Sequence, residues 1–227
     1  MNRFCFLLSV VMAPVLSAEV CFNTTNCTLT LDSTEENRFG AGPYGTVNLA
    51  LVANTIKITV DLADGLGFNL INTGSHKAFT FNNNLGGAAV EMSSFNSTLY
   101  SPVVGSPGKN SPFGAFMNGV ESTCTDGSGC GTNTLVFTVT TNDGFANVNQ
   151  LIKLSTGNNP AYFAADIANG RGVTGVVGAT STFGCIGCGD SLSVVPEPSY
   201  VVPLISGFGL LVFARERRRR KAVKPAA

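Results

Sequence analysis

The chain of 227 residues contains no tryptophan and one histidine, and only 12% of its residues are charged. So little charge excludes the long Lys- and Glu-rich helical faces of a typical cytosolic enzyme. The single histidine, His76, has no partner with the spacing that a Cys/His zinc site requires. The lack of tryptophan removes the largest aromatic side chain from any surface that would stack against sugars.

Patterns that carry catalysis are also missing. A Ser/His/Asp triad on a nucleophile elbow needs a G-x-S-x-G sequence, which is absent, and no EF-hand loop is present. The glycine-rich sequences GAGPYG and NGRG do not precede helical patterns, which disfavours a phosphate-binding loop. We therefore expect no enzyme activity, no catalytic residue, no metal and no cofactor. A calcium site built from Asp61, Asp64, Asp126 and loop carbonyls is the alternative.

The charges that are present are segregated along the chain, although the formal net charge is zero. Residues 19–195 contain 6 Lys and Arg against 12 Asp and Glu, whereas residues 196–227 contain 7 Lys and Arg against 2 Glu. The body is mildly acidic and the tail is strongly basic. Because the body lacks a basic footprint, we expect no nucleic acid among its partners.

The first 18 residues have the pattern of a secretory signal peptide. Arg3 precedes an apolar run from Phe4 to Val15, and the small residues Ser17 and Ala18 follow. The run is too short to span a hydrocarbon core of roughly 30 Å. A signal peptide over residues 1–18 predicts export. A buried first strand or an uncleaved anchor is the alternative.

Export changes the interpretation of the cysteines. Six remain after Cys5 leaves with the signal peptide, and they fall into three close pairs. An even number of cysteines in an exported chain predicts disulfides, and pairing between neighbours is the simplest arrangement. The disulfide candidates are Cys21, Cys27, Cys124, Cys130, Cys185 and Cys188.

The last pair, Cys185 and Cys188, lies in a CIGC sequence, which redox and zinc sites also use. A redox CxxC normally begins a helix after a strand, whereas this one lies in a glycine-rich exit from the domain. We interpret the pair as a structural disulfide, with a redox or metal site as the alternative.

The middle of the chain has the pattern of strands. Apolar and polar residues alternate with a period of two in residues 46–52, 56–63 and 134–141, and the short link between the first two runs predicts a hairpin. Turn signals are dense, and no apolar stripe of helical period is present. We predict an antiparallel β-sandwich or jelly-roll-like ectodomain over residues 19–190. Further strand candidates are residues 67–71, 77–81, 89–93, 113–118, 162–167 and 175–177.

The C-terminal segment has three successive parts. Residues 191–198 form a linker that ends in Pro-Glu-Pro, residues 199–214 carry no charge, and a basic tail follows over residues 215–227. A helix over the uncharged residues would be about 24 Å long, and flanking arginines can extend to the membrane surface. We therefore predict a single transmembrane helix over residues 199–214. The basic residues that retain the tail in the cytoplasm are Arg215, Arg217, Arg218, Arg219, Arg220 and Lys221.

This arrangement resembles the PEP-CTERM sorting signal, with Pro196, Glu197 and Pro198 matching its Pro-Glu-Pro motif. The resemblance implies that exosortase, a membrane cysteine peptidase of exopolysaccharide-producing, mostly Gram-negative bacteria, cuts near the motif, with Glu197 as the recognised charge. The two prolines fix φ and lack N–H donors, so the motif stays extended and accessible. A single-span anchor that is never cut is the alternative.

Two stretches of the body, residues 67–74 and 162–179, are also similar to segments of one group of proteins that carry this tag. That group has no established activity. We therefore expect an exported protein, first anchored in the inner membrane and then at the cell surface or in the extracellular matrix of a Gram-negative bacterium. Exosortase and exopolysaccharide are its expected partners, and its role is structural or adhesive within a biofilm matrix. The alternative is a polysaccharide-binding or polysaccharide-cleaving module on the same scaffold.

Overall fold

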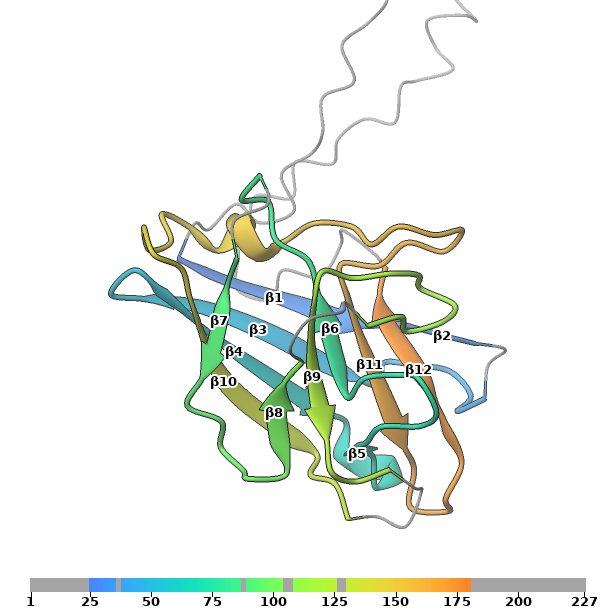
Figure 1. The fold of residues 1–227 in the computed structure, drawn as a ribbon. Coiled ribbons are helices and arrows are strands. Elements are labelled where there is room, and N and C mark those ends of the chain that lie inside the picture. The colour runs from blue at the N-terminus through green and yellow to red at the C-terminus, as the bar shows by residue number, and fades with distance from the viewer. Residues whose placement is uncertain (1–24, 36–37, 87–88, 104–107, 126–129, 181–227) are drawn as a thin grey trace, which may run out of the picture. The chain divides into compact units, whose positions relative to one another are not determined.

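The computed structural model describes residues 25–35, 38–86, 89–103, 108–125 and 130–180 (Figure 1). The chain divides into two units, Met1–Gly189 and Asp190–Ala227, and every described residue belongs to the first. The described residues form two antiparallel sheets, which confirms the predicted all-β class. They contain no α-helix; the 3-10 helices among them are η2 (Asp64–Leu66) and η3 (Val148–Leu151).

The first sheet has five strands in the order β1-β3-β4-β10-β7, and every pair of neighbours is antiparallel. Its longest strands, β3 and β4, form the predicted hairpin. The bounds are β1 (Asn26–Leu31), β3 (Gly45–Val52), β4 (Thr55–Leu62), β7 (Glu91–Ser93) and β10 (Thr134–Thr140).

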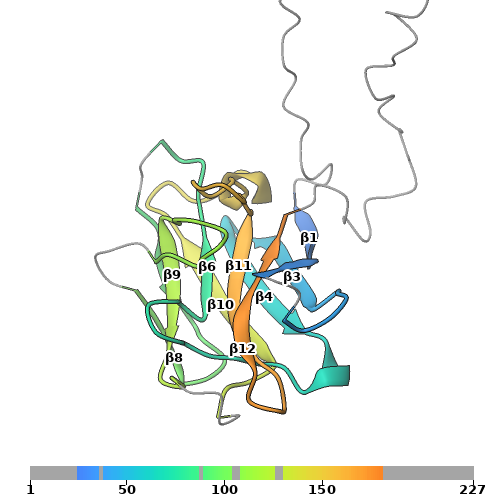
Figure 2. The same ribbon diagram turned by 90° about the vertical axis from the view of Figure 1, so that its right-hand side faces the viewer.

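The second sheet has seven strands in the order β2-β12-β11-β6-β9-β8, with β5 paired to β11. In Figure 1 β6 and β9 lie in front of β3 and β4. In Figure 2, turned by 90°, β8 and β9 lie at the left and β1 and β3 at the right, so the two sheets face each other. The bounds are β2 (Ser33–Thr34), β5 (Asn69–Leu70), β6 (Phe79–Phe81), β8 (Tyr100–Pro102), β9 (Asn118–Ser122), β11 (Phe163–Ala168) and β12 (Thr174–Ala179).

Strands β5 and β6 are two parts of one interrupted strand beside β11. Leu70 of β5 is opposite Ile167, and Phe79 of β6 is opposite Ala165. Residues 71–78 therefore leave the sheet at the position of Asp166 and return to it. Compact surface loops whose ends lie close together have this form.

The period-two patterns are confirmed by burial. The inward positions of β3, β4 and β10 are buried, apart from the half-buried Leu51, while their neighbours are half-buried or exposed. The link between β3 and β4 consists of Ala53 and Asn54, with φ values of 46° and 65°. Positive φ at both central residues gives a two-residue turn the twist that a hairpin requires.

Phenylalanine side chains fill the space between the sheets. Phe137 of β10 contacts Phe79 and Phe81 of β6, with ring centroids 6.1 Å apart in each pair. Phe79 also stacks on Phe163 of β11 at 5.8 Å. All four rings are fully buried, and such pairs contribute packing beyond their buried area.

The strand predicted over residues 113–118 is wrong except at Asn118, where β9 begins. The apolar residues of that stretch, Phe113 and Phe116, are buried in a loop against Ala164 and Val176. Those two positions point away from the five-stranded sheet, because their neighbours along β11 and β12 belong to the main core. The apolar stretch thus covers the outer face of a sheet instead of pairing within it. Strands β1, β2 and β8, and residues 119–122 of β9, are not among the predicted strands.

Truncation of Phe137 tests the inter-sheet core. Phe137→Ala is expected to lower the free energy of unfolding by about 3–5 kcal/mol, because it leaves a cavity among three other rings. Thr138→Ala on the opposite face of the same strand is the matched control, expected to cost about 0.5 kcal/mol. Urea unfolding of the full-length chain measures both, and equal losses for the two variants would contradict this core.

Candidate functional site

Most of the predicted site residues lie outside the described part of the structure. These are the cysteines Cys21, Cys185 and Cys188, the motif Pro196, Glu197 and Pro198, and the basic cluster Arg215, Arg217, Arg218, Arg219, Arg220 and Lys221. The predicted transmembrane helix over residues 199–214 lies there too. Within the described ranges no helix has the length and apolar character needed to cross a membrane.

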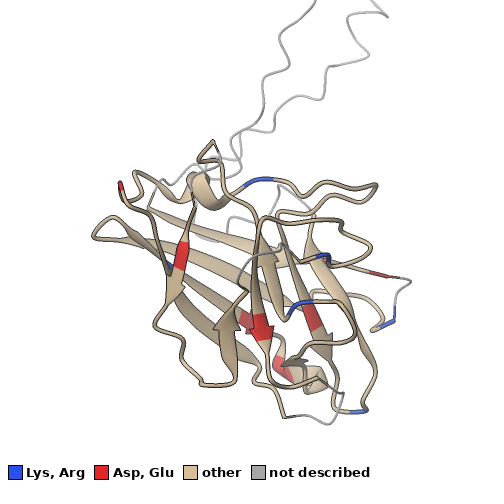
Figure 3. Ribbon diagram, in the orientation of Figure 1, with Lys and Arg blue, Asp and Glu red and all other residues tan. Residues whose placement is uncertain are grey.

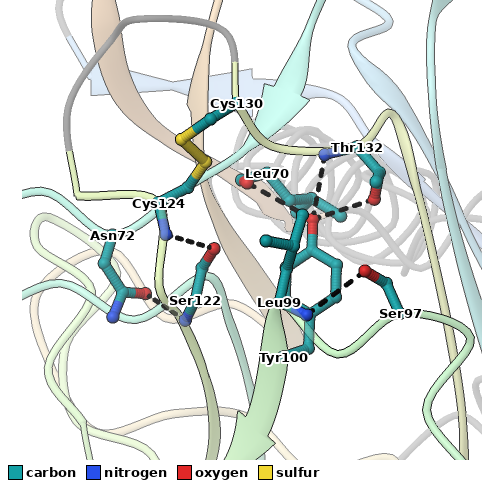
Figure 4. Close-up of a disulfide and its surroundings, with 9 residues drawn as sticks. All are labelled: Leu70, Asn72, Ser97, Leu99, Tyr100, Ser122, Cys124, Cys130 and Thr132. Carbon is teal, nitrogen blue, oxygen red and sulfur yellow. Dashed lines mark hydrogen bonds between the residues drawn. A yellow bond between two sulfur atoms is a disulfide. The ribbon is translucent and has the colours of Figure 1, made fainter.

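The predicted pairing of Cys124 with Cys130 is confirmed (Figure 4). The bridge joins the end of β9 to the residues before β10, with Cα atoms 5.8 Å apart. The N–H of Cys124 donates to Ser122 Oγ at 3.1 Å. Cys27, buried on β1, is also disulfide-bonded.

The hydroxyl of Tyr100 organises the same end of the domain. It accepts a hydrogen bond from the N–H of Thr132 at 3.1 Å and lies 2.9 Å from Thr132 Oγ1. The Tyr100 hydroxyl donates to the carbonyl of Leu70 at 3.4 Å, and Thr132 Oγ1 donates to the carbonyl of Thr134 at 2.7 Å. Figure 4 shows this network next to the disulfide, where it holds the chain that leads into β10.

A carboxyl group is buried on the outer face of the seven-stranded sheet. Asp166 of β11 is fully buried, and its Oδ2 accepts hydrogen bonds from the N–H and Oγ1 of Thr73 at 2.5 and 2.6 Å. Its Oδ1 is buried without a hydrogen-bond partner. Burial raises the pKa of Asp166 from 3.8 to about 7, and the hydrogen bonds from Thr73 offset part of that rise.

The segment that covers Asp166, residues 71–78, is held by two asparagine side chains. Asn72 Oδ1 accepts from the N–H groups of Ala78 and Ser122 at 2.7 and 3.1 Å. Asn110 Oδ1 accepts from the N–H of Lys77 at 2.8 Å, and its Nδ2 donates to the Lys77 carbonyl at 3.0 Å. Side chains thus replace the missing sheet partners of this backbone.

His76 lies in the same segment and is half-buried, with Nδ1 buried and without a partner. Burial lowers the pKa of its imidazole; Glu35 opposes this change and Arg38 reinforces it. Nδ1, the nitrogen that the acid of a catalytic triad would orient, has no such partner among the described residues.

The carboxylates of the alternative calcium site make other contacts. Asp61 Oδ1 accepts from Thr134 Oγ1 at 2.9 Å, and Asp64 Oδ1 accepts from Asn133 Nδ2 at 3.1 Å. Asp126 lies outside the described residues. No group of three His, Cys, Asp or Glu among the described residues is placed to hold a metal ion.

Charged side chains are few and separated on the described domain. Figure 3 shows the Lys and Arg positions of the described residues as short blue segments that are separated from one another along the ribbon. Binding of a nucleic-acid backbone requires clustered Lys and Arg.

Comparison of the chain with models of protein families, with curated proteins and with solved structures found no match. The function of the chain therefore has to be inferred from its own residues and geometry.

Asp166 was not among the residues singled out in the sequence. It stands within FAADIA, where every residue is buried. An acidic residue in the middle of an otherwise apolar strand is a signal of a buried carboxyl, because such a group is buried only with specific partners. Its partner, Thr73, is 93 positions away and could not be identified without the fold.

Replacing Asp166 with Asn is expected to change the dependence of stability on pH. Between pH 3.8 and about pH 7, Asp166 of the folded protein retains a proton that it has lost in the unfolded chain. The contribution of Asp166 to stability is therefore complete below about pH 4, falls by roughly 1.4 kcal/mol per pH unit, and is lost above about pH 7. Relative to Asp166→Asn, the wild type is expected to lose stability across this interval.

Urea unfolding of the full-length protein at several values between pH 4 and pH 8 measures this difference. Asp143→Asn, which removes an exposed carboxyl, is the control and is expected to keep the wild-type slope. Parallel pH profiles for the wild type and Asp166→Asn would show that the pKa of the Asp166 carboxyl is not raised in the folded protein.

The double variant Cys124→Ala, Cys130→Ala tests the disulfide. Its cysteines are only 6 positions apart, so the bridge closes a short loop and contributes about 2 kcal/mol. A loss of this size in urea unfolding without reductant is expected. Unchanged stability would mean that the bridge does not constrain the unfolded chain.

Proposed function

We propose that this chain is an exported protein sorted through a PEP-CTERM-like signal and processed by exosortase. The observation that carries the proposal is the adjacency of three features: the Pro196–Pro198 motif, the uncharged residues 199–214, and the basic residues from Arg215 to Lys221. A proline-stiffened peptide is accessible to a peptidase. The basic cluster keeps the tail on the cytoplasmic side, so the motif and the body face outward.

The disulfide between Cys124 and Cys130 supports export. Disulfides persist in oxidising compartments such as the periplasm and the cell surface and are rare in the cytosol. A bridge next to the chain entering β10 also suits a domain that has to remain folded outside the cell.

The position of the domain in the sequence supports processing at the motif. The last described strand, β12, ends at Ala179, and residues 180–195 separate it from Pro196. A cut near the motif would therefore leave every described strand on the released side. The folded body does not depend on the tail for any strand pairing described here.

For the body we propose a structural or adhesive role within exopolysaccharide. Threonine is the commonest residue at its outward strand positions on β3, β4 and β10, where Lys57 and Asp61 are the charged residues. Such a surface is wet and nearly uncharged. It suits contact with hydrated polysaccharide better than contact with a charged polymer.

Intact-mass analysis of the protein released from the host surface tests the sorting proposal. We expect the mature form to end near Pro198 and to lack residues 215–227. Glu197→Gln is expected to accumulate as the longer precursor, because it removes the charge assigned to recognition. Glu216→Gln, an acidic residue beyond the uncharged segment, is the matched control and should mature normally. A wild-type surface form that still contains Lys224 would contradict processing and leave a permanent anchor.

A further inference from the structure

We infer that residues 71–78 form a proton-sensitive strap, which stays closed over β11 while the carboxyl of Asp166 is protonated and opens more often once it is ionised. This device is independent of the sorting signal. It concerns the folded body alone.

The geometry makes Asp166 the main anchor of the strap. The N–H of Ile71, at the beginning of the strap, donates to the carbonyl of Asp166 at 3.0 Å. The N–H of Asp166 donates to the carbonyl of Ala78, at the end of the strap, at 3.2 Å. Between these ends, Thr73 donates twice to the Asp166 side chain. One residue therefore holds the strap at both ends and at Thr73.

The closed strap leaves one oxygen of Asp166 without a partner. Oδ2 has two donors, whereas Oδ1 is buried and has none. A neutral carboxyl tolerates this site, but an ionised one places half of its charge on an oxygen that neither protein nor solvent stabilises. Opening of the strap admits water to Oδ1, so ionisation favours the open state. Burial holds the pKa of the closed form at about 7.

The other attachments of the strap are local and polar. They are the hydrogen bonds that Asn72 Oδ1 and Asn110 Oδ1 accept, and the bond from the Asn72 N–H to the Cys124 carbonyl at 2.7 Å. The ion pair between the partly exposed side chains of Lys77 and Glu121 is a further polar attachment. Ile71 packs with Cys124 and Ala168, and Ala78 belongs to the main core, whereas residues 72–77 between them are half-buried or exposed. A segment with so few apolar contacts can open without unfolding the sheets.

Few other charged groups face this site. Strands β5, β6 and β12 contain no charged residue, and Asp166 is the only one on β11. The strap itself carries His76 and Lys77, Lys77 pairs with Glu121 of β9, and Glu35 and Arg38 act on His76. Lys109 lies on the loop that contacts Phe116. Histidine is the residue type among these whose ordinary pKa lies near the relevant pH, so the experiment has to separate His76 from Asp166.

Hydrogen exchange of the full-length protein at pH 5 and pH 7.5 tests the strap. After correction for intrinsic exchange rates, protection of the amides of Thr73 and Ala78 is expected to fall at least tenfold at the higher pH. The reason is that Asp166 ionises at a lower pH in the open strap than in the closed one, so opening becomes more favourable with each pH unit between the two pKa values. In Asp166→Asn, protection at these amides should change less than threefold.

Two variants and one internal comparison identify the cause. His76→Gln is expected to retain the tenfold fall in amide protection between pH 5 and pH 7.5. Loss of this pH dependence in His76→Gln would assign the switch to the histidine and overturn the proposal. Glu121→Gln should lower protection equally at both pH values, because it weakens the strap without adding a titrating group. Equal loss of protection in β3 and β4 would indicate global unfolding and would also overturn it.

Thr73→Val provides a test that does not require Asp166 to be replaced. It removes the Oγ1 donor, which favours the ionised carboxylate, so the pKa of Asp166 is expected to rise. The pH at which strap protection stops falling should therefore shift upward. A shift downward, or none, would contradict the role of the carboxyl.

Discussion

The structure depends on the apolar layer between the two sheets. Phe137 from one sheet and Phe79, Phe81 and Phe163 from the other meet there and are fully buried. Because side chains alternate along a strand, this layer fixes which positions face inward on every strand that borders it. A shift of one residue in any central strand would move apolar side chains into water and polar ones into the core.

The same constraint places Asp166. Ala165 and Ile167 point into the core, so Asp166 points to the opposite face of β11, where a solvated carboxylate would be ordinary. Instead, the excursion between β5 and β6 and the loop with Phe113 and Phe116 cover that face. The seven-stranded sheet is thus buried on both sides around β11, and a titratable group lies within the second layer.

The sequence pattern predicts those parts of the fold that depend on residues close together in the sequence. The alternation in β3, β4 and β10 and the neighbour pairing of Cys124 with Cys130 both follow from residues close in sequence. The pattern does not predict β1, β2 and β8, and it wrongly predicts a strand at Phe113. Whether such a stretch pairs with a sheet or packs on its face depends on residues far away in the sequence. The contact between Asp166 and Thr73 is of the same distant kind. Its one local sign was an acidic residue inside FAADIA.

The carboxyl of Asp166 tests three features together: the register of β11 directs it to the outer face, the strap covers it, and the second apolar layer buries it. Carbon-13 NMR of selectively labelled aspartate, assigned by comparison with Asp166→Asn, measures its ionisation directly in the folded protein. The account predicts a carboxyl carbon that titrates with a pKa of about 7. A value close to 4, as for an aspartate in water, would contradict it.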